Sequence, residues 1–255
     1  MNKESSVRRL RSEIVYGPVC SRRFGNSLGI NISGKSKYCS FNCLYCFRGK
    51  NDGSPESTDF LKMLPSVDMV IDSFKKWLIN TYETVDDITI AGNAEPTNHP
   101  DFPEIVEEII RLRDRHLPQV RISVLTNGTG LLPRMNNKYR YVQHALEKIN
   151  QPCLKLDSGV PETWQKISMP YGNITFSEWF DSVKILNNPI IQTMLMKGIV
   201  NNTSDNELTH LKKCYEMLNP KGIQVLNINK PTAVSGVYPV ERIDFRKAKN
   251  FLTNW

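Results

Sequence analysis

Three cysteines lie within eight residues of one another, in the stretch CSFNCLYC at positions 39–46. Three residues separate Cys39 from Cys43, and two separate Cys43 from Cys46. Thiolates are soft ligands for zinc and iron. A structural zinc site normally takes four ligands in closely spaced pairs, but no Cys or His follows Cys46 until His99. An iron–sulfur cluster held by three thiolates would leave one iron open for chemistry, and we favour that interpretation.

A disulfide is the third interpretation of the cysteine stretch, and it would leave one thiol over. Disulfides also belong to oxidising compartments, whereas the N-terminal sequence MNKESSVRRLRSE has no apolar secretion signal. The sequence contains no stretch of about 18 uncharged apolar residues, so it predicts no membrane span. We therefore expect a cytoplasmic protein with reduced thiols and no membrane association.

Short apolar stretches alternate with amphipathic ones along the chain. The predicted strands are residues 27–33, 87–92, 120–126, 153–159, 191–198 and 222–229. The predicted helices are residues 67–78, 102–116, 137–149, 174–187, 205–218 and 240–254. Such alternation predicts βαβ units, and six of them predict an α/β fold of the partial (β/α)6 TIM-barrel type. Active sites of barrels lie at the C-terminal ends of the strands, where the cysteine stretch also falls.

The 255 residues have an ordinary composition, with 40% hydrophobic and 23% charged residues. No repeat or long linker divides the chain, so we expect a single domain, with a core over about residues 15–230 and a C-terminal helix at 240–254.

The formal net charge of +7 allows an acidic partner, such as nucleic acid, an acidic peptide or a phosphorylated ligand. A solvated, lysine-rich surface explains it equally well.

The stretch CSFNCLYC resembles the Cys-x3-Cys-x-aromatic-Cys motif of the radical S-adenosylmethionine (radical SAM) superfamily, with Tyr45 at the aromatic position. The resemblance implies a [4Fe–4S] cluster on Cys39, Cys43 and Cys46, with the amino and carboxylate groups of SAM on its open iron. It also implies that reductive cleavage of SAM gives a 5′-deoxyadenosyl radical, which abstracts hydrogen from a substrate.

Other stretches resemble the same superfamily at the ends of predicted strands. AGNAEP (91–96) resembles its GGEP motif, with Asn-Ala in place of Gly-Gly, and VLTNG (124–128) resembles the end of its third strand. The last strand, GIQVLNIN (222–229), resembles one that borders adenine. A narrower resemblance, to short Fe–S oxidoreductases related to wyosine synthases, rests on VYGPVCSRRFGNSLGINI, AEPTNHPDF and KLDSG. The cofactor-binding residues that these resemblances imply are Tyr45, Asn93, Ala94, Glu95, Thr126, Asn127, Asp157 and Asn227.

Several polar residues have two interpretations each. Lys155 and Asp157 share one face of a predicted strand and would either hold ligand or form an internal ion pair. Lys155, together with Lys197 and Asn229 near the ends of later strands, is a candidate for substrate binding. An ordinary surface position is nearly as good an interpretation of Lys197. We expect Cys20 to be a small buried side chain. A local role at a turn or helix start is expected for His99.

The substrate is the least determined part of the prediction, because members of one superfold differ in their cavities. Our leading hypothesis is hydrogen abstraction from a peptide, such as a ribosomal natural-product precursor undergoing splicing, epimerisation or crosslinking. A separate small recognition protein and an external electron donor would then be needed. Modification of a tRNA base is the alternative, suggested by the basic charge and the wyosine-synthase likeness. A non-catalytic iron–sulfur electron carrier is a third possibility.

Overall fold

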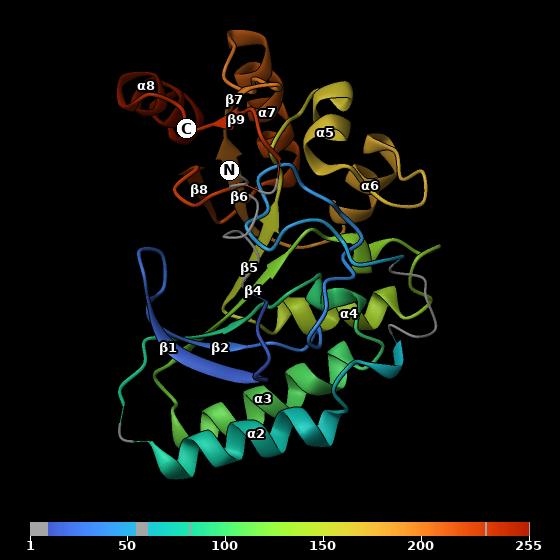
Figure 1. Cartoon of the computed structure of the whole chain (residues 1–255), viewed down its shortest axis with the longest axis vertical. Helices are drawn as coiled ribbons and strands as arrows, with labels where there is room; N and C mark the ends of the chain where they lie inside the picture. Colours follow the sequence, from blue (N-terminus) through green and yellow to red (C-terminus); the bar gives the residue numbers. More distant parts are fainter. Residues whose placement is uncertain (1–9, 55–60, 82, 233, 255) are drawn as a thin grey trace, which may run out of the picture. The chain divides into compact units, whose positions relative to one another are not determined.

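The computed structural model describes residues 10–54, 61–81, 83–232 and 234–254. These residues form two compact units, which Figure 1 shows with the chain coloured along its length. The first unit contains residues 10–40 and 52–152, and the second contains residues 41–51 and 153–254. Within the described residues, no helix has the length and apolar character needed to span a bilayer.

The sheet of the first unit has three parallel strands and one antiparallel edge strand. Strand β1 (Val15–Ser21) pairs antiparallel with β2 (Gly25–Ile30). Parallel pairs then join β2 to β3 (Asp87–Ile90) and β3 to β4 (Arg121–Thr126). The register aligns Leu28, Ile88 and Ile122, which are all fully buried, so one face of this sheet is a continuous apolar surface.

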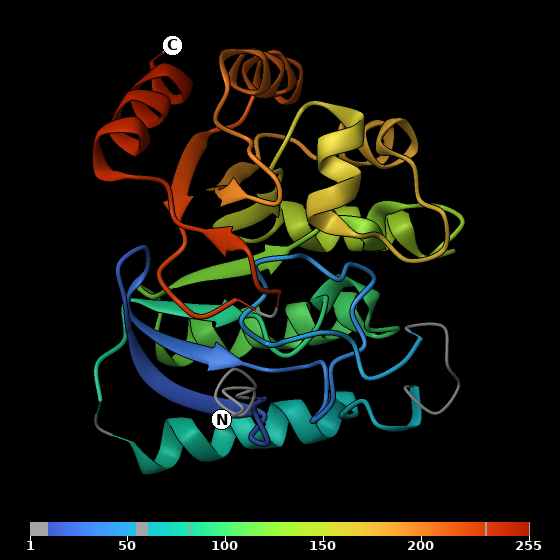
Figure 2. The same cartoon turned by 45° about the horizontal axis from the view of Figure 1, so that its top comes forward.

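Helices with both ends in the described residues complete the first unit. They are α2 (Val67–Asn80), η1 (Pro96–Asn98), α3 (Phe102–His116), η2 (Thr129–Leu131) and α4 (Tyr139–Glu147). Helix α2 begins after Ser66, whose hydroxyl accepts a hydrogen bond from the Met69 amide, and it buries Val70, Ile71 and Phe74. Helices α2 and α3 lie side by side against the β1–β2 side of the unit in both views (Figures 1 and 2).

The second unit has three parallel strands. Strand β5 (Gln151–Lys155), which begins in the last two residues of the first unit, pairs with β6 (Ile190–Leu195), and β6 pairs with β8 (Gly222–Asn227). Strands β7 (Lys197–Gly198) and β9 (Val237–Tyr238) form a short antiparallel pair. The helices are α5 (Pro161–Ser168), α6 (Phe176–Val183), α7 (Asp205–Leu218) and α8 (Arg242–Thr253).

The predicted alternation of strands and helices is confirmed, and the elements that it did not include are β1, β9, α5, η1 and η2. Strand β1 was not predicted, because Gly17 and Pro18 argue against a strand. The structure places them at an irregularity in the β1–β2 register, between Tyr16 and Val19, on an edge strand that tolerates proline. Helix α5 was not predicted either, because its two turns are too short for a clear apolar period.

Five of the six predicted strands end earlier than expected, at Ile30, Ile90, Lys155, Leu195 and Asn227, and one cysteine was misplaced. The strand predicted to reach residue 159 stops at Lys155. The strand predicted over residues 191–198 divides into β6 and β7, because the Met196 amide donates to the Asn202 side chain instead of continuing the ladder. The expectation that Cys20 is buried was wrong: it lies exposed on β1.

Candidate functional site

The cysteine stretch begins in the first unit, with Cys39, and continues in the second, with Cys43 and Cys46. All three thiols are half-buried, and none is in a disulfide. The Cys46 amide donates to the Cys43 carbonyl at 3.0 Å, and the Gly49 amide donates to the Cys46 carbonyl at the same distance. Successive turns therefore give the segment that carries Cys43 and Cys46 a defined backbone. In the described ranges, no three Cys, His, Asp or Glu side chains are arranged to enclose a single metal ion.

Helix α5 holds the part of the cysteine stretch that lies in the second unit. The Asn42 amide donates to the Ser168 carbonyl at 2.9 Å, and the Leu44 amide donates to the Ile167 carbonyl at 3.0 Å. Carbonyls in the last turn of a helix have no partner within the helix, so they are available for such bonds. Phe41 adds an edge-to-face contact with Trp164 of α5.

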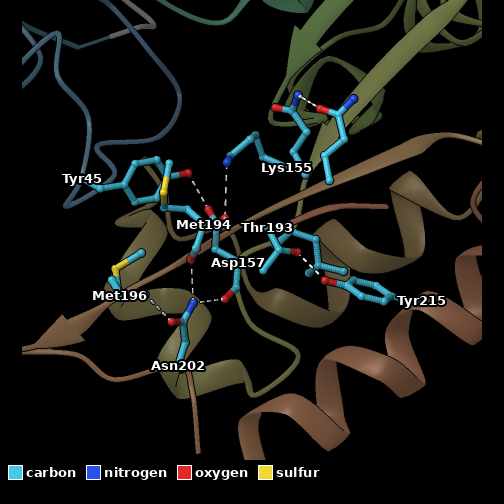
Figure 3. Close-up of polar contacts among 11 residues, drawn as sticks. Tyr45, Lys155, Asp157, Thr193, Met194, Met196, Asn202 and Tyr215 are labelled. Carbon is cyan, nitrogen blue, oxygen red and sulfur yellow. Dashed lines mark hydrogen bonds and ion pairs between the residues drawn. The ribbon is translucent and has the colours of Figure 1, made fainter. Parts of the chain in front are cut away.

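Tyr45 and Asp157 are brought together in the second unit, as Figure 3 shows. The Tyr45 hydroxyl donates to Oδ2 of Asp157 at 2.5 Å, while Oδ1 accepts from the Met194 amide at 2.7 Å. Lys155 Nζ lies 3.4 Å from Oδ1 and 5.0 Å from the Tyr45 ring centroid. Burial, and secondly the Asp157 charge, raise the pKa of Tyr45 well above its ordinary value, so the phenol stays protonated and donates.

Asn202, which no sequence motif selected, holds the same region from the other side (Figure 3). Its Nδ2 donates to the carbonyls of Asp157 and Met194 at 2.7 and 2.8 Å, and its Oδ1 accepts from the Met196 amide at 2.8 Å. This fully buried amide therefore joins the backbone after β5 to that of β6. A lone asparagine in a predicted loop carries no sequence signal for such a role.

Glu95 connects the ends of β3 and β4 in the first unit. Its Oε1 accepts hydrogen bonds from the Thr97 amide, the Thr97 hydroxyl and the Thr126 hydroxyl, and its Oε2 accepts from the Asn127 amide at 2.6 Å. The side chain is buried, and burial raises the pKa of Glu95, while these hydrogen bonds act in the opposite direction. Four donors on one carboxylate fix the two strand ends to each other.

The side-chain amide of Asn127 is fixed on both sides. Its Oδ1 accepts from the Thr129 amide at 3.0 Å and from the Thr129 hydroxyl at 2.8 Å. Its Nδ2 donates to the Ser40 hydroxyl at 3.1 Å and to the Cys39 sulfur at 3.7 Å. The Thr129 backbone amide, which can only donate, defines which end of the side-chain amide is the oxygen. Glu95, Thr126 and Asn127 are thus assembled with Cys39 within one unit.

Asn93 and Ala94 form a bend after β3. The buried Asn93 side chain accepts from the Arg11 amide at 2.8 Å and donates to the carbonyls of Arg11 and Gly34, both at 2.9 Å. Ala94 is half-buried beside it. The side chain of Asn93 therefore supports the loop, whose backbone is the part that the motif resemblance singled out.

The remaining candidates have other hydrogen-bond and ion-pair partners. Lys197 Nζ is 2.7 Å from Asp244 of α8, and both side chains are partly exposed. The Asn227 amide exchanges hydrogen bonds with the backbone of Val240, and Asn229 is exposed beyond β8. The local role expected of His99 is confirmed, because its ring bonds the Pro65 carbonyl and the Asp101 amide at the start of α3.

The family model of the radical SAM superfamily matches residues 35–209, which is more than half of the chain and includes the cysteine stretch. The chain belongs to the radical SAM superfamily. The resemblance stated from the sequence motifs is therefore confirmed, and so is the α/β fold class.

Curated relatives are similar over most of this radical SAM chain. A UPF0026 protein of Synechocystis sp. is 30% identical over 86% of this chain and 75% of its own length. A protein named GTPase Obg of Brachyspira hyodysenteriae is 27% identical over 98% of this chain. The match spans only 35% of that second protein.

Solved radical SAM structures share the fold at low sequence identity. TYW1 with a lysine-pyruvate adduct aligns with a TM-score of 0.57 and 16% identity, over 89% of this chain and 72% of that one. Streptococcus suis SuiB bound to its precursor peptide SuiA aligns with a TM-score of 0.60 and 14% identity, over 88% of this chain and 44% of that one.

Proposed function

We propose that Cys39, Cys43 and Cys46 hold a [4Fe–4S] cluster, and that the chain uses it to cleave SAM reductively. Membership of the superfamily over residues 35–209 is the observation that carries this proposal. The chemistry of the donor set fits the cofactor, because three thiols with no disulfide lie within eight residues. When bound, a cluster with an open iron supplies the electron that splits the sulfonium of SAM.

The residues of the motifs that resemble the superfamily would bind and orient SAM. The backbone of Asn93, Ala94 and Glu95 is assigned to the methionyl amino group, on a loop that side-chain bonds of Asn93 and Glu95 hold in place. The Glu95 carbonyl also accepts from the Asn98 amide at 3.3 Å. Thr126 and Asn127 lie at the end of β4, where the SAM carboxylate or ribose is expected. Tyr45, Asp157 and Asn227 are proposed to border the nucleoside.

The substrate class that we propose is a peptide, with abstraction of one of its hydrogens as the first step. Support comes from the fold shared with SuiB, which was solved with its precursor peptide. Lys155, Lys197 and Asn229 are the candidates for contact with the peptide. A small recognition protein would deliver the peptide, and an external donor would reduce the cluster.

The central experiment compares Cys43→Ala with Cys20→Ala after anaerobic reconstitution with iron and sulfide. We expect the wild type to absorb visible light through the cluster and, once reduced, to convert SAM to 5′-deoxyadenosine. Cys43→Ala should lose both properties. Cys20→Ala should keep both, because that thiol is exposed on β1 outside the motif.

Two outcomes would reject parts of the proposal. Tetrahedral zinc in place of iron in the anaerobic wild type would remove its basis. A cluster without any 5′-deoxyadenosine would indicate an electron carrier. If deuterium from a labelled tRNA, and not from labelled peptides, appears in 5′-deoxyadenosine, the substrate is RNA, and its binding should weaken steeply with salt.

A further inference from the structure

Asn127 was expected to contact SAM, yet its side-chain amide is directed at a cysteine. Nδ2 lies 3.7 Å from the Cys39 sulfur, within hydrogen-bonding range for sulfur, and 3.1 Å from the Ser40 hydroxyl. All of these atoms belong to one unit of the structure.

The orientation of this amide is set by its other contacts. The Thr129 backbone amide, which can only donate, faces Oδ1 at 3.0 Å, so a rotation of the side-chain amide by half a turn would place donor against donor. The Asn127 backbone is held as well, by the 2.6 Å hydrogen bond from its amide to buried Glu95. The Nδ2 group is therefore a fixed donor toward Cys39 rather than a mobile side chain.

A fixed donor to a ligating sulfur has a definite chemical effect. Hydrogen bonds to the sulfurs of an iron–sulfur cluster are among the factors that set its reduction potential, because they stabilise the additional negative charge of the reduced state. We propose that Asn127 is a positioning residue that donates to the Cys39 sulfur and raises the reduction potential of the bound cluster. This inference rests on the proposed cysteine-ligated cluster.

The test is an EPR-monitored redox titration of reconstituted protein in the absence of SAM. Leaving SAM out ensures that a change in potential cannot come from a lost contact with SAM. Asn127→Leu, which keeps the approximate size but removes the donor, should give a more negative midpoint potential than the wild type. Asn98→Leu is the matched control: Asn98 belongs to the same network, because its Oδ1 lies 3.2 Å from the Thr129 hydroxyl, and that hydrogen bond involves no cysteine.

Asn127→Asp is the second variant, because it keeps an acceptor oxygen for Thr129 but removes the donor. It should also lower the potential. Equal potentials in the wild type and in a cluster-containing Asn127 variant would overturn the inference. So would the loss of the cluster from both Asn127 variants with circular dichroism unchanged, since Asn127 would then act in assembly. A wild type without a cluster would instead contradict the proposed function itself.

Discussion

Asp157 illustrates how much of a residue's role depends on its neighbours. The sequence placed it beside Lys155 on one strand face and left ligand binding and an ion pair as alternatives. The structure pairs the two residues at 3.4 Å and adds two hydrogen-bond donors, Tyr45 and the Met194 amide. Both carboxylate oxygens therefore have protein partners, and Asp157 links the cysteine stretch to β5 and β6.

Tyr45→Phe tests this link, because it removes the hydroxyl and keeps the ring. Oδ2 of buried Asp157 would lose its donor, and we expect the free energy of unfolding to fall by about 1–3 kcal/mol, measured by urea denaturation. Tyr171→Phe is the control, since Tyr171 is 40% exposed. Equal stabilities of the two variants would contradict the structural role of the Tyr45 hydroxyl.

The sequence was sufficient to select candidate residues, but not the residues that support them. The spacing of the cysteines and the AEP and TNG stretches were enough to select Cys39, Glu95 and Asn127. Neither Asn202 nor the bonds of Glu95 to Thr97 and Thr126 could be predicted, because they join residues from separate loops and leave no periodic pattern.

At the scale of elements, α5 is the feature that supports the cysteine stretch in the second unit. Its last-turn carbonyls accept from Asn42 and Leu44, and Leu44 packs in an apolar cluster with Ile167, Met196 and Val237. The residues Ser204 and Glu207 at the start of α7 form half of a capping box. The Ser204 hydroxyl accepts from the Glu207 amide, but the Glu207 carboxylate accepts from Ser158 instead of returning to the cap.

The loop after β5 depends on a close approach to α7. A methyl group on Gly159 would lie 2.4 Å from the His210 carbonyl oxygen, whereas one on Gly222 would meet only Ile190, at 3.9 Å. Backbone atoms cannot move aside easily, so we expect Gly159→Ala to cost about 1–3 kcal/mol in unfolding free energy. Gly222→Ala is the matched control in the same thermal or urea measurement. A Gly159→Ala protein as stable as Gly222→Ala would show that the loop can shift freely.

At the scale of the molecule, the alternation of strands and helices was predictable, and the division into two units was not. Residues 41–51 belong to the same unit as residues 153–254, although about a hundred residues separate the two ranges in sequence. No linker-like composition marks where the chain passes from one unit to the other. Such long-range grouping comes from packing, not from local periodicity.

The first unit also contains a buried acid that should affect stability. Asp87 is fully buried on β3 and accepts hydrogen bonds from the hydroxyls of Thr89 and Ser123. Burial raises the pKa of Asp87 above its ordinary value of 3.8, against the effect of those hydrogen bonds. Between the two pKa values the native protein binds more protons than the unfolded chain, so the unfolding free energy falls as the pH rises.

Asp87→Asn should remove this contribution, so its unfolding free energy should decline less than that of the wild type as the pH rises above 3.8. Urea denaturation at a series of pH values measures the difference. Asp72→Asn makes the same change of charge at an exposed position on α2. In this control the unfolding free energy should depend on pH as it does in the wild type. A parallel decline in wild type and Asp87→Asn would contradict the raised pKa.

The four hydrogen bonds that the Glu95 carboxylate accepts have one more consequence. Because Thr97, Thr126 and Asn127 already restrain the ends of β3 and β4, folding itself has removed their conformational freedom. A small molecule that docks against this backbone would lose little further chain entropy, so more of its contact energy would remain as affinity.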